Sequence, residues 1–182
     1  MNDGNNRNAR LVAPTRRNVI AGIAAALGAS PCVWGQAQTK QESTKEAQSA
    51  GVEGLLTYLH QEIAVKASRQ RIYDALLDSK QFAAFSGAPA EISRDAGGTF
   101  SLFGGLIVGR NVELVPRERV VQAWRPASWE PGLYSLARFE LKEWGQQTKV
   151  VLDHTGFPEG DFRHLNSGWY EHYWEPLRKF LA

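Results

Sequence analysis

The most constraining feature of this sequence is a series of short segments, over residues 90–155, in which apolar and polar residues alternate. The segments LIVGRNVELVP, VVQAWR, LYSLARFELKEW and TKVVLDHTGF are separated by short stretches rich in turn residues, such as PASWEPG and GQQ. Alternation with a period of two predicts strands, and closely spaced strands with such turns predict an antiparallel meander. A sheet with one apolar face must bury that face against another element.

The segment before this series contributes one more strand and two short helices. In YLHQEIAVKA the alternation predicts a strand with one buried face formed by Leu59, Gln61, Ile63 and Val65. Ser68 is expected to cap the first helix, and Asp78 or Ser79 the second. Gly87 and Pro89 end the second helix, because neither residue continues a helix well.

The final stretch, DFRHLNSGWYEHYWEPLRKFLA, predicts a long amphipathic helix. Its apolar residues follow one another at steps of three and four, which places them on one face: Leu165, Trp169, Tyr173, Leu177 and Phe180 or Leu181. Pro176 lies inside the helix and is expected to bend it or to restart its last turn. No other element is long enough to cover the sheet. The predicted fold is therefore α+β, with a curved antiparallel sheet wrapped around this helix.

The N-terminal part of the chain has the layout of a cleavable signal. A basic region precedes an uncharged run from Val19 to Leu27, which is less than half the length of a membrane-spanning helix. Small residues at Gly35 and Ala37 then predict a cleavage site. The stretch TRRNVIA resembles the twin-arginine export signal. The alternatives are an ordinary amphipathic helix, against which the missing polar face argues, and a lipid anchor on Cys32, which the preceding Pro31 disfavours.

This layout predicts three parts: a signal peptide over 1–37, a flexible spacer over 38–54 and one domain over 55–182. The expected location is the periplasm. Loss of the signal removes the single cysteine and leaves 17 basic and 18 acidic residues. A balance of this kind argues against nucleic-acid binding, and after signal removal no integral membrane segment is expected.

Several motifs occur in order along the domain: Gly97-Gly98, GR-x-x-ELVP from Gly109 to Pro116, Trp124-Arg125, SW-x-PG from Ser128 to Gly132, and Gly168-Trp169. Together they resemble the C-terminal domain of activators of the heat-shock-protein-90 ATPase, over about Gln61 to Leu181. That family belongs to the START-like (SRPBCC), helix-grip superfamily. The resemblance implies a curved sheet, two short helices after the first strand, and a long C-terminal helix beside a cavity.

The resemblance leaves three functions open. The first is binding of a hydrophobic or amphipathic small molecule in the cavity. The second is a co-chaperone-type role, in which the outer face of the sheet binds a protein partner and activates a chaperone ATPase. The third is a pocket enzyme of the cyclase or hydrolase kind, which would need two polar groups that converge in the cavity.

The candidate ligand-binding residues are aromatic or polar residues that the fold would bring near the space between sheet and helix: Phe82, Phe85, Trp124, Arg125, Trp129, His154, Trp169 and Tyr173. The alternative for the aromatic residues is plain core packing, and for His154 a hydrogen bond inside the core. No catalytic residue, cofactor or metal site is predicted. His164 and His172 lie on one side of the last helix but about 12 Å apart by helical rise, which is too far to share one ion.

Overall fold

A computed structural model describes residues 51–182 of the chain. The predicted signal peptide and residues 38–50 of the predicted spacer lie outside the described residues. Residues 51–53 are helical, and two hydrogen bonds join Glu53 and Gly54 to the start of the C-terminal helix and the loop before it. Arg163 Nε donates to Glu53 Oε2 over 2.9 Å, and the Gly160 N–H donates to the Gly54 carbonyl over 2.8 Å. The last residues of the predicted spacer therefore pack against the domain.

The core of the fold is one seven-stranded sheet in which all neighbours are antiparallel. The spatial order is β1-β7-β6-β5-β4-β3-β2, so only β1 pairs with a strand remote from it in sequence. The strands are β1 (Tyr58–Val65), β2 (Glu91–Ile92), β3 (Thr99–Leu102), β4 (Ile107–Val115), β5 (Arg119–Pro126), β6 (Ser135–Trp144) and β7 (Gln147–Thr155). The predicted antiparallel meander is confirmed.

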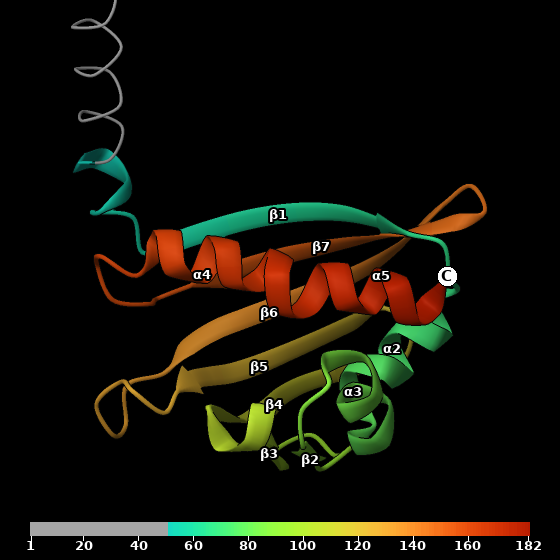
Figure 1. The fold of residues 1–182 in the computed structure, drawn as a ribbon, viewed down its shortest axis with the longest axis horizontal. Coiled ribbons are helices and arrows are strands. Elements are labelled where there is room, and N and C mark those ends of the chain that lie inside the picture. Colours follow the sequence, from blue (N-terminus) through green and yellow to red (C-terminus); the bar gives the residue numbers. More distant parts are fainter. Residues whose placement is uncertain (1–50) are drawn as a thin grey trace, which may run out of the picture.

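The helices lie on one side of this sheet (Figure 1). Two short helices, α2 (Arg69–Leu77) and α3 (Ser79–Ser86), follow β1, and a 3₁₀ turn (Phe103–Gly105) joins β3 to β4. The C-terminal helix consists of α4 (Phe162–Gly168), a π-helical turn (Trp169–Trp174) and α5 (Glu175–Leu181). It runs along the sheet as drawn in red in Figure 1, with α3 against α5. The curved sheet around a C-terminal helix confirms the predicted α+β, helix-grip fold.

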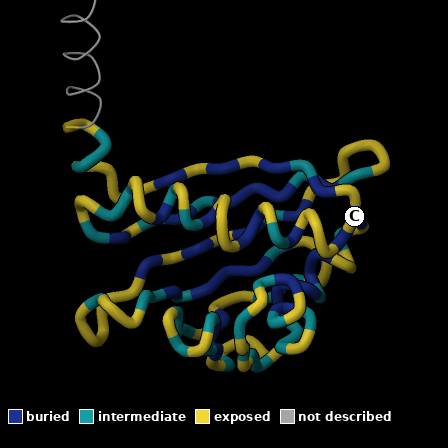
Figure 2. The backbone as a smooth tube through the Cα atoms, viewed as in Figure 1, coloured by how far each residue is buried: buried dark blue, intermediate teal, exposed yellow. Residues whose placement is uncertain are grey.

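Burial follows the predicted alternation closely (Figure 2). In β1 the residues Leu59, Gln61, Ile63 and Val65 are buried and their neighbours are more exposed. The predicted helix caps are also present. The Ser68 hydroxyl accepts from the Arg71 N–H, and Asp78 Oδ1 accepts from the N–H groups of Lys80 and Gln81.

The C-terminal helix buries the predicted stripe, and Leu181 rather than Phe180 is its last buried member. Five buried residues are spaced by four, Leu165, Trp169, Tyr173, Leu177 and Leu181, and Trp174 is buried beside them. On a regular helix a step of four overshoots a full turn by about 40°, so the stripe would wind away from the sheet. The π-helical turn widens the helix and keeps the stripe facing the sheet. The Glu175 N–H donates to the Tyr170 carbonyl, five residues earlier.

Pro176 lies directly after this wide turn, at the start of α5. A proline has no N–H to donate to the carbonyl four residues earlier, so a regular helix would lose a bond at this position. The sequence left two outcomes open for Pro176, a bend of the helix or a restart of its last turn. In the structure the π turn ends at Trp174 and an α-helix starts again at Glu175, with Pro176 in its first turn.

The glycine-containing motifs build the part of the sheet formed by β3, β4 and β5. An added Cβ at Gly109 would overlap the Ala123 carbonyl oxygen and lie 2.9 Å from Phe100 Cε2. Asn111 is fully buried two residues later. Its side-chain amide donates to the Ser93 carbonyl over 2.7 Å and accepts from Gln122 Nε2 over 3.0 Å. These motif residues therefore support the fold.

We predict that Gly109→Ala lowers the free energy of unfolding by at least about 2 kcal/mol, because backbone of β5 and the ring of Phe100 occupy the space of the new methyl group. Urea unfolding followed by circular dichroism measures this difference. Gly168→Ala is the matched control, since the nearest atom to its added Cβ is His172 Cδ2 at 3.9 Å. Equal unfolding free energies for the two variants would contradict the steric explanation.

Candidate ligand-binding cavity

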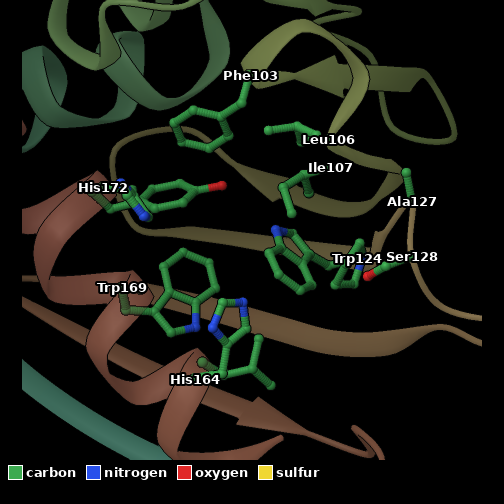
Figure 3. Close-up of a pocket in the computed structure, with 13 residues that line it drawn as sticks. Phe103, Leu106, Ile107, Trp124, Ala127, Ser128, His164, Trp169 and His172 are labelled. Carbon is green, nitrogen blue, oxygen red and sulfur yellow. The ribbon is translucent and has the colours of Figure 1, made fainter.

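A cavity of about 350 Å³ lies between the C-terminal helix, the 3₁₀ turn and the adjoining ends of β4 and β5 (Figure 3). Its wall is mostly apolar. The lining residues are Phe103, Leu106, Ile107, Trp124, Pro126, Ala127, Ser128, His164, Leu165, Gly168, Trp169, His172 and Tyr173. This volume is at the small end of the range usual for small-molecule sites.

The C-terminal helix supplies one side of the cavity because its lining residues recur at four-residue spacing. One row consists of His164, Gly168 and His172, and the next row consists of Leu165, Trp169 and Tyr173. Figure 3 shows Trp169, His164 and His172 coming from the helix, with Trp124 and Ile107 on the opposite side. Gly168 has no side chain, so the wall is hollowed at that position.

The 3₁₀ turn supplies the aromatic ring of Phe103. Phe103 has a φ of 51°, a left-handed conformation that is uncommon for a residue with a side chain. Its ring centroid lies 5.4 Å from that of Tyr173 and 6.2 Å from that of His172. The strained backbone of this turn therefore places a ring against the helix and closes one end of the cavity.

Two residues of the cavity wall each have a buried polar atom without a partner in hydrogen-bond geometry among residues 51–182. These atoms are the indole Nε1 of Trp124 and the phenol oxygen of Tyr173. Burial raises the pKa of Tyr173, while the nearby Trp124 indole acts in the opposite direction. The phenol is therefore protonated at neutral pH and carries a hydrogen that it can donate.

The mouth of the cavity has a different character from its interior. His164, His172 and Ser128 line the cavity and are exposed to solvent. Leu106, which follows the 3₁₀ turn, is 67% exposed although it is apolar. The site therefore combines an apolar interior with a partly polar entrance.

A chain of hydrogen bonds runs behind the cavity wall and joins the helix to three strands. Trp169 Nε1 donates to His154 Nδ1 over 3.0 Å. The hydrogen of the neutral imidazole is then on Nε2, which lies 2.6 Å from Ser135 Oγ and donates to it. The Ser135 hydroxyl donates in turn to the Trp124 carbonyl over 2.9 Å. Both imidazole nitrogens of His154 are therefore engaged inside the core.

Three of the eight sequence-predicted residues line the cavity: Trp124, Trp169 and Tyr173. The structure places the others outside its wall. His154 is part of the hydrogen-bond chain described above. Phe82 packs behind Tyr173, with ring centroids 5.7 Å apart, and Phe85 packs against Phe82 at 4.7 Å.

Arg125 and Trp129 hold the loop between β5 and β6. Arg125 Nη1 donates to the Trp129 carbonyl over 2.8 Å, and its guanidinium lies 5.8 Å from the centre of the Tyr134 ring. Trp129 Nε1 donates to Asp161 Oδ2 over 2.6 Å, which joins this loop to the start of α4. In this arrangement Arg125 stabilises a loop, and its guanidinium is not on the cavity wall.

Sequence reasoning missed the contributions of Phe103, Leu106 and Ile107, because a glycine-rich stretch gives no signal that it will face a helix. It also missed the roles of His164, Gly168 and His172. Their four-residue spacing beside the apolar stripe was a usable signal. On sequence grounds His164 and His172, eight residues apart, are considered only as possible metal ligands, and residues 51–182 contain no cluster of three or more metal-ligating side chains. None of the helices in this part of the chain combines the length and apolarity needed to span a bilayer.

The sheet, the helix that it grips and the cavity between them define the helix-grip class of START-like domains. Within this class, the family model described as "Activator of Hsp90 ATPase homolog 1-like protein" matches residues 66–182, and the chain belongs to this family.

Sequence relatives agree with this assignment. The human Activator of 90 kDa heat shock protein ATPase homolog 1 is 26% identical over 112 residues, which are 62% of this chain and 33% of the human protein. The Dictyostelium discoideum homolog is 33% identical over 98 residues, or 53% of this chain and 26% of that protein. The chain thus spans about a third or less of the length of these relatives.

Among solved structures, an HSP90 activator from Plasmodium falciparum superposes with a TM-score of 0.65 at 24% identity, covering 69% of this chain and 96% of the other. The Aha1 dimer from Colwellia psychrerythraea gives a TM-score of 0.60 at 23% identity, with the same coverages. At this identity the likeness establishes the fold.

The buried position of His154 leads to a prediction about pH. Burial lowers the pKa of His154 from 6.5 to about 3, so the unfolded chain binds this proton more readily than the folded one. The free energy of unfolding therefore falls as the pH drops below about 6.5 and continues to fall toward pH 3. Between pH 7 and pH 5 we expect a loss of about 2 kcal/mol from this residue.

Urea unfolding of the wild type and His154→Gln at both pH values measures this loss. The glutamine variant should be less stable at pH 7 but should lack this part of the pH dependence. His60→Gln, at an exposed histidine on the outer face of the sheet, is the control and should keep it. The same pH dependence in wild type and His154→Gln would contradict the assignment.

Proposed function

We propose that this domain binds a hydrophobic or amphipathic small molecule in the cavity between the sheet and the C-terminal helix. The observation that carries the proposal is the cavity itself, with about 350 Å³ of space and a mostly apolar wall. An apolar hollow of this size that opens to solvent beside a packed core is the usual form of a small-molecule site.

The surroundings of the cavity support its persistence as a defined site. Trp169 is fixed to His154 by a hydrogen bond and packs on Tyr173, with ring centroids 4.3 Å apart. On the opposite side, Trp124 packs on Trp129 at 6.1 Å, and Trp129 is bonded to Asp161. These contacts, and the contact between the Trp124 and Trp169 rings at 5.5 Å, fix the positions of the rings that line the cavity.

Gly168→Leu tests this proposal directly. An added side chain at Gly168 meets little before the cavity, so we expect it to fill the space while the domain stays folded. Binding of the neutral fluorescent probe N-phenyl-1-naphthylamine should weaken at least about tenfold. Ser167→Leu adds the same side chain one residue earlier, at an exposed position, and should leave probe binding unchanged. Equal probe binding by the two variants, or no binding by the wild type, would contradict a ligand role for this cavity.

A protein partner is the second candidate, favoured by the names of the relatives, which are activators of a chaperone ATPase. In this reading the outer face of the sheet makes the contact. That face carries ion pairs between Lys149 and Glu62 and between Arg119 and Glu113, both at 2.8 Å. Stimulation of a purified heat-shock-protein-90 ATPase by the domain would support this candidate. Reversal of charge at Lys149 should then reduce stimulation, while Gly168→Leu should not.

The pocket-enzyme alternative has less support. His154 is the residue best suited to carry a proton, but both of its ring nitrogens are engaged in the core and burial keeps it neutral. Arg125 lies on the loop side of β5. Of the polar side chains expected to converge, Tyr173 reaches the cavity, and its raised pKa disfavours a role as a base.

We further propose that the domain is exported to the periplasm by a twin-arginine signal, on the basis of the sequence of the first 37 residues. Replacement of Arg16 and Arg17 by lysine keeps the charge but removes the pair that the export receptor reads. We expect this variant to remain in the cytoplasm, while the wild type accumulates in the periplasm with a mature N-terminus near Gln38. Cell fractionation and intact-mass measurement report both outcomes.

The matched control replaces Arg7 and Arg10 by lysine, which leaves the pair at 16–17 intact and should not affect export. Equal export of both variants would contradict the twin-arginine assignment. A wild-type chain that stays uncleaved in the cytoplasm would contradict the assignment of any export signal.

A further inference from the structure

Two residues on the wall of the cavity, Trp124 and Tyr173, each have a buried hydrogen-bond donor without a partner in hydrogen-bond geometry among residues 51–182. The Trp124 indole can only donate, and its Nε1 has no partner in residues 51–182. The Tyr173 phenol is protonated, and its oxygen has no partner in hydrogen-bond geometry in the same residues. The Trp124 indole is near enough to act on the pKa of this phenol, but an indole cannot accept the phenol hydrogen. Trp124 is 4% exposed and Tyr173 5%, so bulk water does not solvate these groups.

The two groups belong to the same cavity but come from opposite sides of it. Trp124 is on β5, and Tyr173 is in the π-helical turn of the C-terminal helix. If the indole turned its hydrogen toward the phenol oxygen, the phenol hydrogen would still lack an acceptor. In either arrangement at least one donor hydrogen remains unmatched, and an unmatched buried donor is destabilising.

The interior of the cavity offers nothing to balance a full charge. The titratable side chains on its wall besides Tyr173 are His164 and His172, and both are exposed at the mouth. A buried carboxylate would require a cation beside it. The nearest candidate in sequence, Arg125, holds the Trp129 carbonyl instead. The chemistry of the wall therefore suits a neutral acceptor on an apolar body.

We propose that the ligand of this cavity is an uncharged apolar molecule with a carbonyl oxygen, and that this oxygen accepts hydrogen bonds from Trp124 Nε1 and the Tyr173 hydroxyl. The proposal rests on the proposed small-molecule function and specifies its ligand class. The apolar body packs against Phe103, Ile107 and Trp169, and the carbonyl group lies between the strand and the helix. The two donors then select ligands by polarity, and the rest of the wall selects them by shape.

Two probes of matched shape test the proposal: 9-fluorenone, which has a carbonyl group, and fluorene, which lacks it. Isothermal titration calorimetry with the folded domain should show fluorenone binding at least about fivefold more tightly than fluorene, because only the ketone satisfies the buried donors. In ¹⁵N NMR spectra the Trp124 indole N–H resonance should move downfield with fluorenone and much less with fluorene.

Variants that remove single donors complete the test. Tyr173→Phe keeps the ring and removes only the hydroxyl, so it should reduce the preference for fluorenone to about twofold or less without weakening fluorene binding. Tyr170→Phe is the matched control, because Tyr170 is 40% exposed on the same helix. Trp124→Phe should also reduce the preference, with the exposed Trp144→Phe as its control.

The outcomes separate the two proposals. Equal affinity for the two probes, or a preference that persists in Tyr173→Phe combined with Trp124→Phe, overturns the carbonyl assignment but leaves the small-molecule function standing. Absence of binding by both probes, together with no binding of N-phenyl-1-naphthylamine, overturns both. Thermal unfolding checks that each variant is folded. Tyr173→Phe should be at least as stable as the wild type, since it removes an unmatched buried group.

Discussion

A chain of three hydrogen bonds fixes the C-terminal helix relative to the sheet, and the cavity depends on it. The bonds run from Trp169 through His154 and Ser135 to the Trp124 carbonyl, and so connect the helix to β7, β6 and β5. Every donor in the chain has one acceptor, and the imidazole stays neutral because burial lowers its pKa. A buried polar network that is fully satisfied gives directional constraints that apolar contacts cannot give.

Two tryptophans of the cavity wall differ in their hydrogen bonding. The rings of Trp169 and Trp124 are 5.5 Å apart, yet the first donates to His154 and the second has no acceptor among the described residues. The difference lies in what each nitrogen faces: an imidazole nitrogen on β7 in one case, and no acceptor in hydrogen-bond geometry in the other. Local rules for folding are expected to fail at functional sites, where stability is given up for binding.

The sequence predicted the fold because most of its determinants are local. The alternation in β1, the caps at Ser68 and Asp78, and the stripe on the C-terminal helix are each visible within a few residues. The cavity was predicted only in part. Trp124, Trp169 and Tyr173 were found because large aromatic residues must face the core.

Other parts of the site depend on distant pairings that a single sequence does not show. The 3₁₀ turn at Phe103 reaches the helix only because β3 and β4 pair at the edge of the sheet, where Gly109 allows close packing on Phe100. Arg125 was assigned to a ligand, but its partner is a backbone carbonyl four residues later, a loop geometry that no periodicity encodes.

The spacing of the buried residues on the C-terminal helix has a consequence for how this domain can vary in evolution. Five buried residues at intervals of four, from Leu165 to Leu181, anchor the helix to the sheet. The π-helical turn keeps all five on the face of the helix that meets the sheet. Substitutions between the anchors leave that arrangement unchanged. A single inserted or deleted residue would rotate every later anchor by about 100° around the helix axis. Length changes among homologous domains should therefore accumulate in the turns of the sheet, while this helix keeps a constant number of residues.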